Sequence, residues 1–424
     1  MAKQRTNIFG KPESRTERIK NLAFAASLGA MLCIASTYAW FIGLQEVEVE
    51  DFEVNVSSTD SLLLSLNGKD WDSTIQFSKD DIAEKAYQLP DDENGKRQYP
   101  FNWPKKGIVP LSTIGEMDSN VSRMIIYEKT SLSTTPGGYK LLATRVNNYG
   151  RPLANGEKIQ TGYLAFDLFV KNFSGTHYLE EVDLRNEEAI FLTKNSKVTL
   201  GSLGVAESGI ENSVRVAFSQ IGRVAAYNND PDVITSITCK SSDPSLSGDT
   251  NYITGICRQA AIWEPNDTKH VENAITWYEK SCLLRTGADN SQKDSYIVGS
   301  MCKTVEDGVA YPSYVIKEEI AASDGVDVYD GEAFNGYDVA IADKLVAHPT
   351  FTDTDKDKMG LERLGIFYLA PNSITKLRIY IYLEGQDIDN YDYASFGKQV
   401  KINFGFSKSR EEDDEADESV DFTG

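Results

Sequence analysis

Two kinds of hydrophobic pattern follow one another along the chain. The first is an uninterrupted run, Asn21–Leu44, which contains no charged residue and is long enough to cross a bilayer as a single helix. From Val47 onward, apolar and polar residues alternate in short stretches with a period of two, which is typical of β-strands. The sequence therefore predicts a basic segment at 1–20, an apolar helix at 21–44 and a mainly β region at 45–408.

Within the β region, strand patterns recur at short spacing and few stretches have a helical period. The predicted strands are Val47–Val56, Gly107–Ile114, Arg123–Glu128, Thr161–Asn172, Ala189–Leu192, Lys197–Leu200, Ser213–Tyr227, Gly365–Leu369, Thr375–Glu384 and Gln399–Phe406. Helices are expected only at Asp80–Tyr87, Glu272–Lys280 and Ala340–Ala347. Asn67–Gly68 predicts a hairpin turn inside Ser61–Trp71, with positive φ at both turn residues. Together these features predict an antiparallel, jelly-roll-like β-sandwich.

Two parts of the chain depart from the strand pattern. Residues 228–350 are rich in turn residues and hold four of the five cysteines, so we expect an inserted lobe there. The last stretch, Glu411–Gly424, contains eight acidic residues and no basic one, which predicts an acidic disordered tail at 409–424.

Charge around the apolar run predicts its orientation. Six basic residues precede it against two acidic ones, so the N-terminus should stay in the cytoplasm and the chain after Leu44 should lie outside. The run can be an uncut anchor or a signal peptide. In the second case Thr37, Tyr38 and Ala39 occupy the last positions before the cut by signal peptidase, and Trp40 begins the mature protein. The protein is therefore expected at the cell surface, either tethered or secreted.

The rest of the chain is strongly acidic. The whole protein has a net charge of −21, and the part after Ala39 keeps 37 basic and 62 acidic residues, a net charge of −25. Such a surface repels nucleic acid and favours cations or basic partners, although solubility outside the cell is the simpler explanation of the charge. We expect no nucleic-acid partner.

The cysteines predict disulfides in an oxidising compartment. Cys33 lies in the apolar run, and the other four are Cys239, Cys257, Cys282 and Cys302. Four cysteines allow three pairings, of which Cys239–Cys257 with Cys282–Cys302 closes the shortest loops. Free thiols and a zinc site are the alternatives, but structural zinc prefers close C-x2-C pairs, and the sequence has none.

Catalytic chemistry has no recognisable signature. The chain lacks G-x-S-x-G, H-E-x-x-H, P-loop and G-x-G-x-x-G patterns, and its histidines (His177, His270 and His348) are far apart and expected at the surface or in loops. Asp353, Asp355 and Asp357 alternate as in a calcium loop, without the glycine and glutamate of a complete EF-hand. They predict a calcium site or a solvated acidic loop, and no other cofactor.

Several stretches resemble a known group of exported proteins. The end of the apolar run, Thr37–Phe41, is followed by an alternating valine strand and by Leu64–Trp71, Leu-Ser-Leu-Asn-Gly-Lys-Asp-Trp. This arrangement resembles Gram-positive surface proteins with a SipW-dependent-type signal segment, distantly similar to the TasA and camelysin group. Later stretches that resemble uncharacterised members are Val214–Phe218, Ile262–Asn266 and Leu377–Asp387. The resemblance implies export, a jelly-roll ectodomain, processing after Ala39 and filaments formed by strand exchange.

Two functional classes follow, and neither is an enzyme. The first is a structural surface or biofilm-matrix protein in which Val47–Val56 is donated to a neighbouring copy or pairs within its own sandwich. The second is a membrane-anchored adhesin or ligand-binding module that uses residues 228–350.

Overall fold

In the computed structural model the chain divides into two units, residues 1–45 and 46–424. The structure describes residues 51–55, 62–78, 82–87, 101–102, 108, 110–131, 140–145, 162–175, 177–202, 204–276, 308, 310, 314–318, 329–330, 345–348, 350–390 and 400–408, all in the second unit. The first unit, with the predicted apolar helix, and the predicted acidic tail lie outside the described residues.

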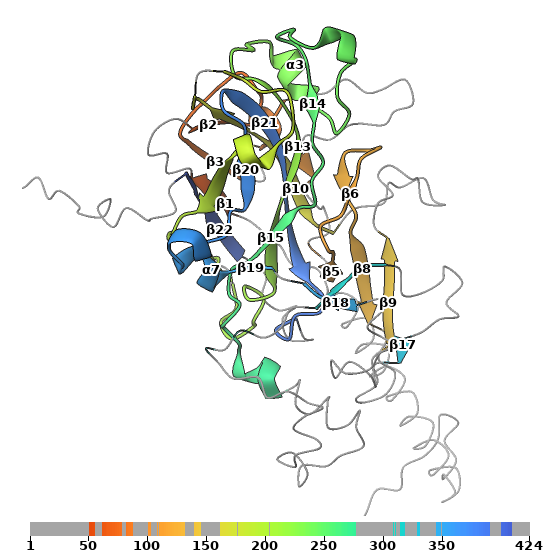
Figure 1. Cartoon of the computed structure of the whole chain (residues 1–424). Coiled ribbons are helices and arrows are strands. Elements are labelled where there is room, and N and C mark those ends of the chain that lie inside the picture. The colour runs from red at the N-terminus through yellow and green to blue at the C-terminus, as the bar shows by residue number, and fades with distance from the viewer. Residues whose placement is uncertain are drawn as a thin grey trace, which may run out of the picture. The chain divides into compact units, whose positions relative to one another are not determined.

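The centre of the second unit is a set of three long antiparallel strands (Figure 1). β21 (Ser373–Glu384) lies between β10 (Leu164–Asn172) and β13 (Val214–Ala225), and pairs with both. β10 and β13 are buried along their whole length, including the polar residues Asp167 of β10 and Arg215 of β13. These strands confirm three of the predicted ones.

Shorter strands extend this central sheet at both sides. They are β2 (Leu62–Ser65), β4 (Phe101–Asn102), β5 (Pro110–Ser112), β8 (Tyr127–Ser131), β9 (Lys140–Arg145), β14 (Thr254–Gly255), β15 (Ala261–Glu264), β17 (Tyr329–Asp330) and β19 (Phe351–Thr352). Most pairs are antiparallel, but β5 pairs with β21 and β19 with β15 in parallel. The sheet is therefore mixed, which corrects the antiparallel prediction.

Two smaller sheets form a second layer. One has the order β12–β22–β1–β3, with β12 (Lys197–Leu200), β22 (Val400–Phe404), β1 (Asp51–Asn55) and β3 (Thr74–Ser78). The other has the order β20–β11–β23, with β20 (Phe367–Leu369), β11 (Glu188–Leu192) and β23 (Phe406–Ser407). β1 pairs in parallel with β22 and antiparallel with β3, so it is an inner strand of its sheet.

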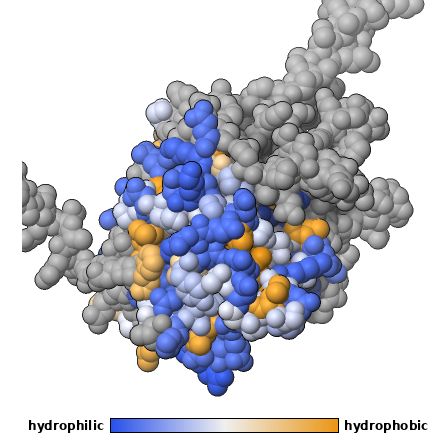
Figure 2. All heavy atoms as spheres, turned by 90° about the horizontal axis from the view of Figure 1, so that it is seen from above, coloured by the Kyte–Doolittle hydropathy of each residue, from blue (hydrophilic) through white to orange (hydrophobic). Residues whose placement is uncertain are grey.

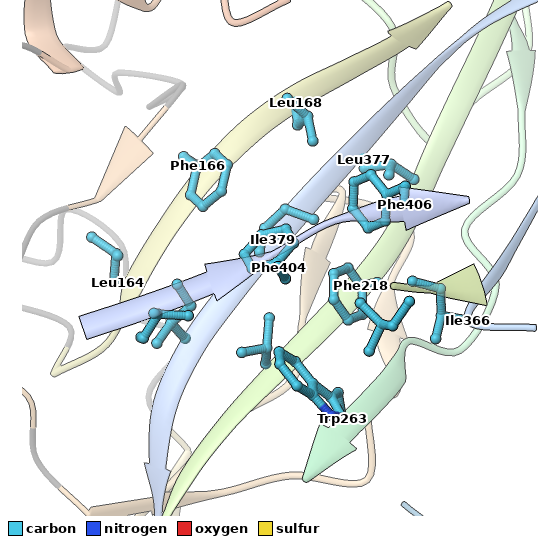
Figure 3. Packing of buried hydrophobic residues seen from close by; sticks show 14 of the residues in the cluster. Leu164, Phe166, Leu168, Phe218, Trp263, Ile366, Leu377, Ile379, Phe404 and Phe406 are labelled. Atoms are coloured by element: carbon cyan, nitrogen blue, oxygen red, sulfur yellow. The ribbon is translucent and has the colours of Figure 1, made fainter. Parts of the chain in front are cut away.

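One hydrophobic cluster fills the space between the two layers. Its members come from the central strands, such as Leu168, Phe218 and Ile379, and from the smaller sheets, such as Phe404 and Phe406. Figure 3 shows these phenylalanines of β22 and β23 lying against the residues of the central strands. The fold is therefore mainly β, as predicted, and its sheets pack against one another around this cluster.

The opposite face of the central sheet is also covered. Tyr163, Tyr380 and Tyr382 pack there with Met124 and Ile126, which follow β6 (Met117–Asp118) in the chain and lie in or beside β7 (Arg123–Met124). Farther along, Phe169 and Ile374 pack against residues around the short helix α3 (Pro231–Thr235). Polar side chains on this face are consequently buried.

The remaining described elements are short. They are α2 (Ile82–Lys85), α7 (Asp353–Asp357), β16 (Tyr314–Ile316), β18 (Leu345–Ala347) and the 3-10 turns η1 (Leu184–Asn186), η2 (Pro244–Leu246) and η5 (Gly360–Glu362). α2 confirms the first predicted helix, and residues 272–276 are helical as expected. The third predicted helix is wrong at 345–347, because β18 pairs there with β16.

The predicted hairpin at Asn67–Gly68 forms a different turn. The chain reverses, since Leu64 and Asp72 exchange backbone hydrogen bonds of 2.8 and 3.0 Å. Only Gly68 has a positive φ, at 71°, while the Asn67 Oδ1 accepts two backbone N–H groups of the turn. The returning strand β3 pairs with β1, so the turn carries the chain from the central sheet to the second layer.

The inserted lobe expected at 228–350 is not separate over its described residues. β15 lies in this range and pairs with β13, and its Trp263 is completely buried in the core. Arg223 of β13 binds Glu187 at 2.6 Å, and Arg258 binds the same carboxylate at 2.6 Å. The segment that carries Cys239 and Cys257 is therefore built into the sandwich.

Figure 2 shows the surface from the end that lies at the top of Figure 1. It is mostly hydrophilic, with small and separate apolar patches. The large apolar side chains exposed among the described residues include Leu361 and Met359 of the η5 turn, at 90% and 62%. Isolated apolar residues of this kind are normal on soluble domains.

Candidate functional site

A buried ionic cluster lies where β13, β15 and β21 approach the same end of the central sheet. Its centre is Arg215 of β13, whose side chain is 1% exposed. The guanidinium donates to Glu264, at the end of β15, and to Asp387, in the turn after β21, where the distance is 2.5 Å. Two backbone carbonyls, of Asn212 and Val214, accept from it at 2.9 and 3.0 Å.

Arg215 stays charged because two carboxylates, Glu264 and Asp387, lie next to its guanidinium group. Burial lowers the pKa of Arg215, but the charges of Glu264 and Asp387 outweigh that effect and hold it above its usual value. Burial likewise raises the pKa of Asp387, against the attraction of Arg215. The ion pairs therefore tie the ends of three strands together at the cost of desolvating several charges.

The same cluster continues through the turn after β21. Asp389 is fully buried and accepts from the backbone N–H of Val271 and from Nδ1 of His270, both at 2.9 Å. His270 lies in a loop, one of the two locations expected for it, but its side chain is only 4% exposed. His177 is exposed as expected, and burial lowers the pKa of His348.

Asp267 lies in the turn that follows β15 and has no partner of its own. It is 2% exposed, and neither carboxylate oxygen has a hydrogen-bond partner among the described residues. Burial and the charges of Glu264 and Asp353 raise its pKa to about 6. Burial also raises the pKa of Asp353, although Lys356 pairs with it at 3.2 Å.

The predicted calcium residues lie on a helix and do not face one another. Asp353, Asp355 and Asp357 belong to α7, where Asp355 forms an ion pair with Lys358 and Asp357 is exposed. Within the part of the chain that the structure describes, no group of three histidine, cysteine or acidic side chains is placed to hold a metal ion. The structure instead brings Asp353 toward Asp267 and Glu264.

A second ionic cluster lies on the covered face of the central sheet. Asp167 of β10 is fully buried and accepts from Arg378 of β21 at 2.6 and 2.9 Å. Tyr87 donates to the same carboxylate at 2.5 Å, and the ammonium group of Lys376 lies 3.4 Å away. Lys376 also donates to the carbonyls of Thr235 and Ile237, at 2.8 and 3.1 Å, and thereby holds α3 against the sheet.

The first predicted disulfide is present. Cys239 and Cys257 are bonded, with their Cα atoms 5.2 Å apart, whereas Cys282 and Cys302 lie outside the described residues. The bond joins the loop after α3 to the second residue after β14. Gly255 passes so close to this loop that a Cβ atom there would overlap the backbone of Cys239.

Loss of this disulfide is expected to cost about 3 kcal/mol of unfolding free energy, because the bond closes a loop with a sequence separation of 18. Cys239→Ser should lower the urea midpoint accordingly, and Cys257→Ser should do so by the same amount. A loss below about 1 kcal/mol in both variants would contradict the expectation.

The predicted processing residues, Thr37 to Trp40, lie outside the described residues. Among the residues that the structure does describe, none belongs to a helix of sufficient length and hydrophobicity to cross a membrane. Searches of the chain against protein-family models, curated proteins and solved structures found no match.

The ionic cluster around Arg215 is not predicted from the sequence. Its acids come from Trp263-Glu-Pro-Asn-Asp267 and Leu383-Glu-Gly-Gln-Asp387, which are far apart in the chain. The signal that could have found them is a shared pattern: each strand ends in a glutamate that is followed by turn residues and an aspartate. Register then places Val214 opposite Leu383 and Val216 opposite Trp263, so both ends meet at Arg215.

Proposed function

We propose that this protein is a non-enzymatic, exported structural protein of the cell surface or extracellular matrix. Its jelly-roll-like ectodomain, residues 45–408, is tethered by the apolar run 21–44 or released by signal peptidase after Ala39. Copies assemble by exchanging β1, which makes a homo-oligomer or filament. The observation that carries this proposal is the position of β1, the first described strand after the N-terminal unit, between two strands of a four-stranded sheet.

Exchange suits β1 because it pairs with two strands that are not its direct neighbours in the chain, one of them near the C-terminal end of the described residues. β3 begins at Thr74 and β22 at Val400, so the slot between them can accept β1 from the same chain or from another copy. Replacing an identical element between copies preserves every backbone hydrogen bond, which makes it a low-cost route to assembly.

Simple edge-to-edge pairing of this sheet is opposed by two polar side chains. Lys85 of α2 donates to the carbonyl of Gln76 on β3 at 2.6 Å. At the other edge, Asn266 donates to the carbonyl of Val198 on β12 at 3.3 Å. Covered edges are a usual protection against uncontrolled pairing, so they favour exchange of the inner strand as the mode of assembly.

The buried charged groups also support a structural role. Arg215, Arg223 and Arg378 each bind carboxylates that come from other segments of the chain. These groups are used to hold strands and loops together, whereas a catalytic group would need access to a substrate.

Filaments are the expected result when the processed ectodomain, Trp40–Gly424, is purified and viewed by negative-stain electron microscopy. Val54→Pro should prevent them, because Val54 lies in the middle of β1, opposite Ile75 and Phe404, and proline removes its backbone donor. Monomers that persist at high concentration in the unsubstituted protein would contradict assembly and would favour the ligand-binding module.

A further inference from the structure

Three acidic residues lie close together near the end of β15, and the ion pairs of the structure neutralise only two of them. Glu264 is matched by Arg215 and also accepts the Thr350 hydroxyl at 2.5 Å. Asp353 is matched by Lys356 at 3.2 Å. Asp267 has neither a cation nor a hydrogen-bond donor for its two oxygens among the described residues, although it is 2% exposed.

The groups that face Asp267 come from three elements. Glu264 of β15 and Asp353 of α7 repel its charge, and Arg215 of β13 attracts it less strongly than these acids repel it. The backbone N–H of Asp353 also favours the ionised form, without reaching hydrogen-bond geometry to either oxygen. Lys269, the nearby cation of the turn, donates instead to Asn266 at 3.1 Å. A proton is the simplest group that can relieve this repulsion.

The residues beside these two aspartates hold the edge of the second layer. Asn266, which precedes Asp267, donates to the carbonyls of Val198 and Glu211 at 3.3 and 3.0 Å. Lys356, on the same helix as Asp353, donates to the carbonyl of Ser196 at 2.5 Å. The turn after β15 and the helix α7 therefore cover the start and the outer edge of β12.

We propose that Asp267 and Asp353 form a proton-dependent latch over the edge of β12. When Asp267 is protonated, it no longer repels Asp353 and Glu264, and its hydroxyl is free to donate to one of them. When it is ionised, the repulsion weakens the attachment of the turn and of α7, and with it the cover over β12. This inference is independent of the proposed function, because it concerns one molecule.

The direction of the pH dependence follows from linkage. The pKa of Asp267 is raised in the folded protein, to about 6 from an ordinary value of 3.8. Between these values the folded state binds more protons than the unfolded state, so acidification stabilises the latch. Its stability is lost as the pH rises from about 3.8 to about 6, and it stays constant at higher pH.

Hydrogen exchange in the monomeric protein tests the latch. At about pH 7.5, Asp267→Asn should slow exchange of the Val198 amide about tenfold relative to the unsubstituted protein, since the neutral amide removes the repulsion. The Val198 N–H is the reporter because it points to the same side of β12 as the covered carbonyl. At about pH 3.5 the two proteins should exchange at the same rate, because Asp267 is then protonated whether the turn is attached or detached.

The control is Asp357→Asn, which makes the same charge change on the same helix at an exposed position. It should leave Val198 exchange unchanged at both pH values. Asp353→Asn, which relieves the repulsion from the other side, keeps the test valid if Asp267→Asn folds poorly. Exchange as fast in both the Asp267 and Asp353 variants as in the unsubstituted protein at about pH 7.5 would overturn the proposal.

Discussion

Asp167→Asn is expected to lower the free energy of unfolding by about 3–5 kcal/mol, because it leaves two buried cations without their counter-charge. Arg378 and Lys376 are both almost completely buried, at 12% and 4% side-chain exposure, and Asp167 is the carboxylate that the structure places beside them. Asparagine has nearly the same shape, so the loss reports charge and hydrogen bonding and creates no cavity.

The pKa values of the cluster show why its charges depend on one another. Burial alone would raise the pKa of Asp167, but Arg378 and Lys376 lower it below its ordinary value of 3.8. Burial lowers the pKa of Lys376 to about 8 even with Asp167 present. An acid whose pKa is lowered by folding stabilises the fold at any pH above its pKa in the unfolded state. The contribution of Asp167 is therefore lost only as the pH falls below about 4.

Urea unfolding at neutral pH measures the effect, with Asp232→Asn as the matched control. Asp232 is exposed, and its replacement should change stability by no more than about 0.5 kcal/mol. A triple variant, Asp167→Leu with Lys376→Met and Arg378→Met, should recover much of the loss, because apolar groups can replace a buried ionic cluster. Equal midpoints for Asp167→Asn and Asp232→Asn would show that the cluster is not buried as described.

The architecture could be read from the sequence where a strand is long enough to show a clear period of two or an apolar stretch. β10, β13, β21 and β22 were all predicted within a few residues, and β12 was predicted with its exact bounds, Lys197–Leu200. β15 was missed because its four residues, Ala261–Glu264, lie between turn-rich stretches and are too short to show a period. Its place in the sheet comes from pairing with β13, which is a tertiary contact.

The candidate site was harder to predict. The pattern of apolar and polar residues shows on which face of a strand a residue lies, but it does not show which other segment packs on that face. In β21, Arg378 and Tyr380 alternate with Ile379 and Ile381, which would equally suit a strand with one solvated side. The structure covers that side with the segment around Met124, so the polar residues become buried partners. Similarly, Asp353 was grouped with Asp355 by spacing, whereas the fold groups it with Asp267.

Phe218→Ala should be the most informative test of the sandwich itself, with an expected loss of about 3–5 kcal/mol. Phe218 is 1% exposed on β13, and its ring lies 5.6 Å from that of Phe404 and 5.8 Å from that of Phe406. These partners belong to the second layer, so truncation removes contacts between the sheets and leaves a cavity at their interface. Part of the lost free energy comes from the edge-to-face contacts of the Phe218 ring with these two rings.

Leu361→Ala supplies the control for this prediction, since Leu361 is 90% exposed and its truncation should cost no more than about 0.5 kcal/mol. The urea midpoint should fall strongly for Phe218→Ala with an unchanged slope, because the surface exposed on unfolding is nearly the same. A midpoint for Phe218→Ala no lower than that for Leu361→Ala would mean that β13 does not pack against β22 and β23. The loss itself would locate a main source of stability in the apolar contacts between the two layers.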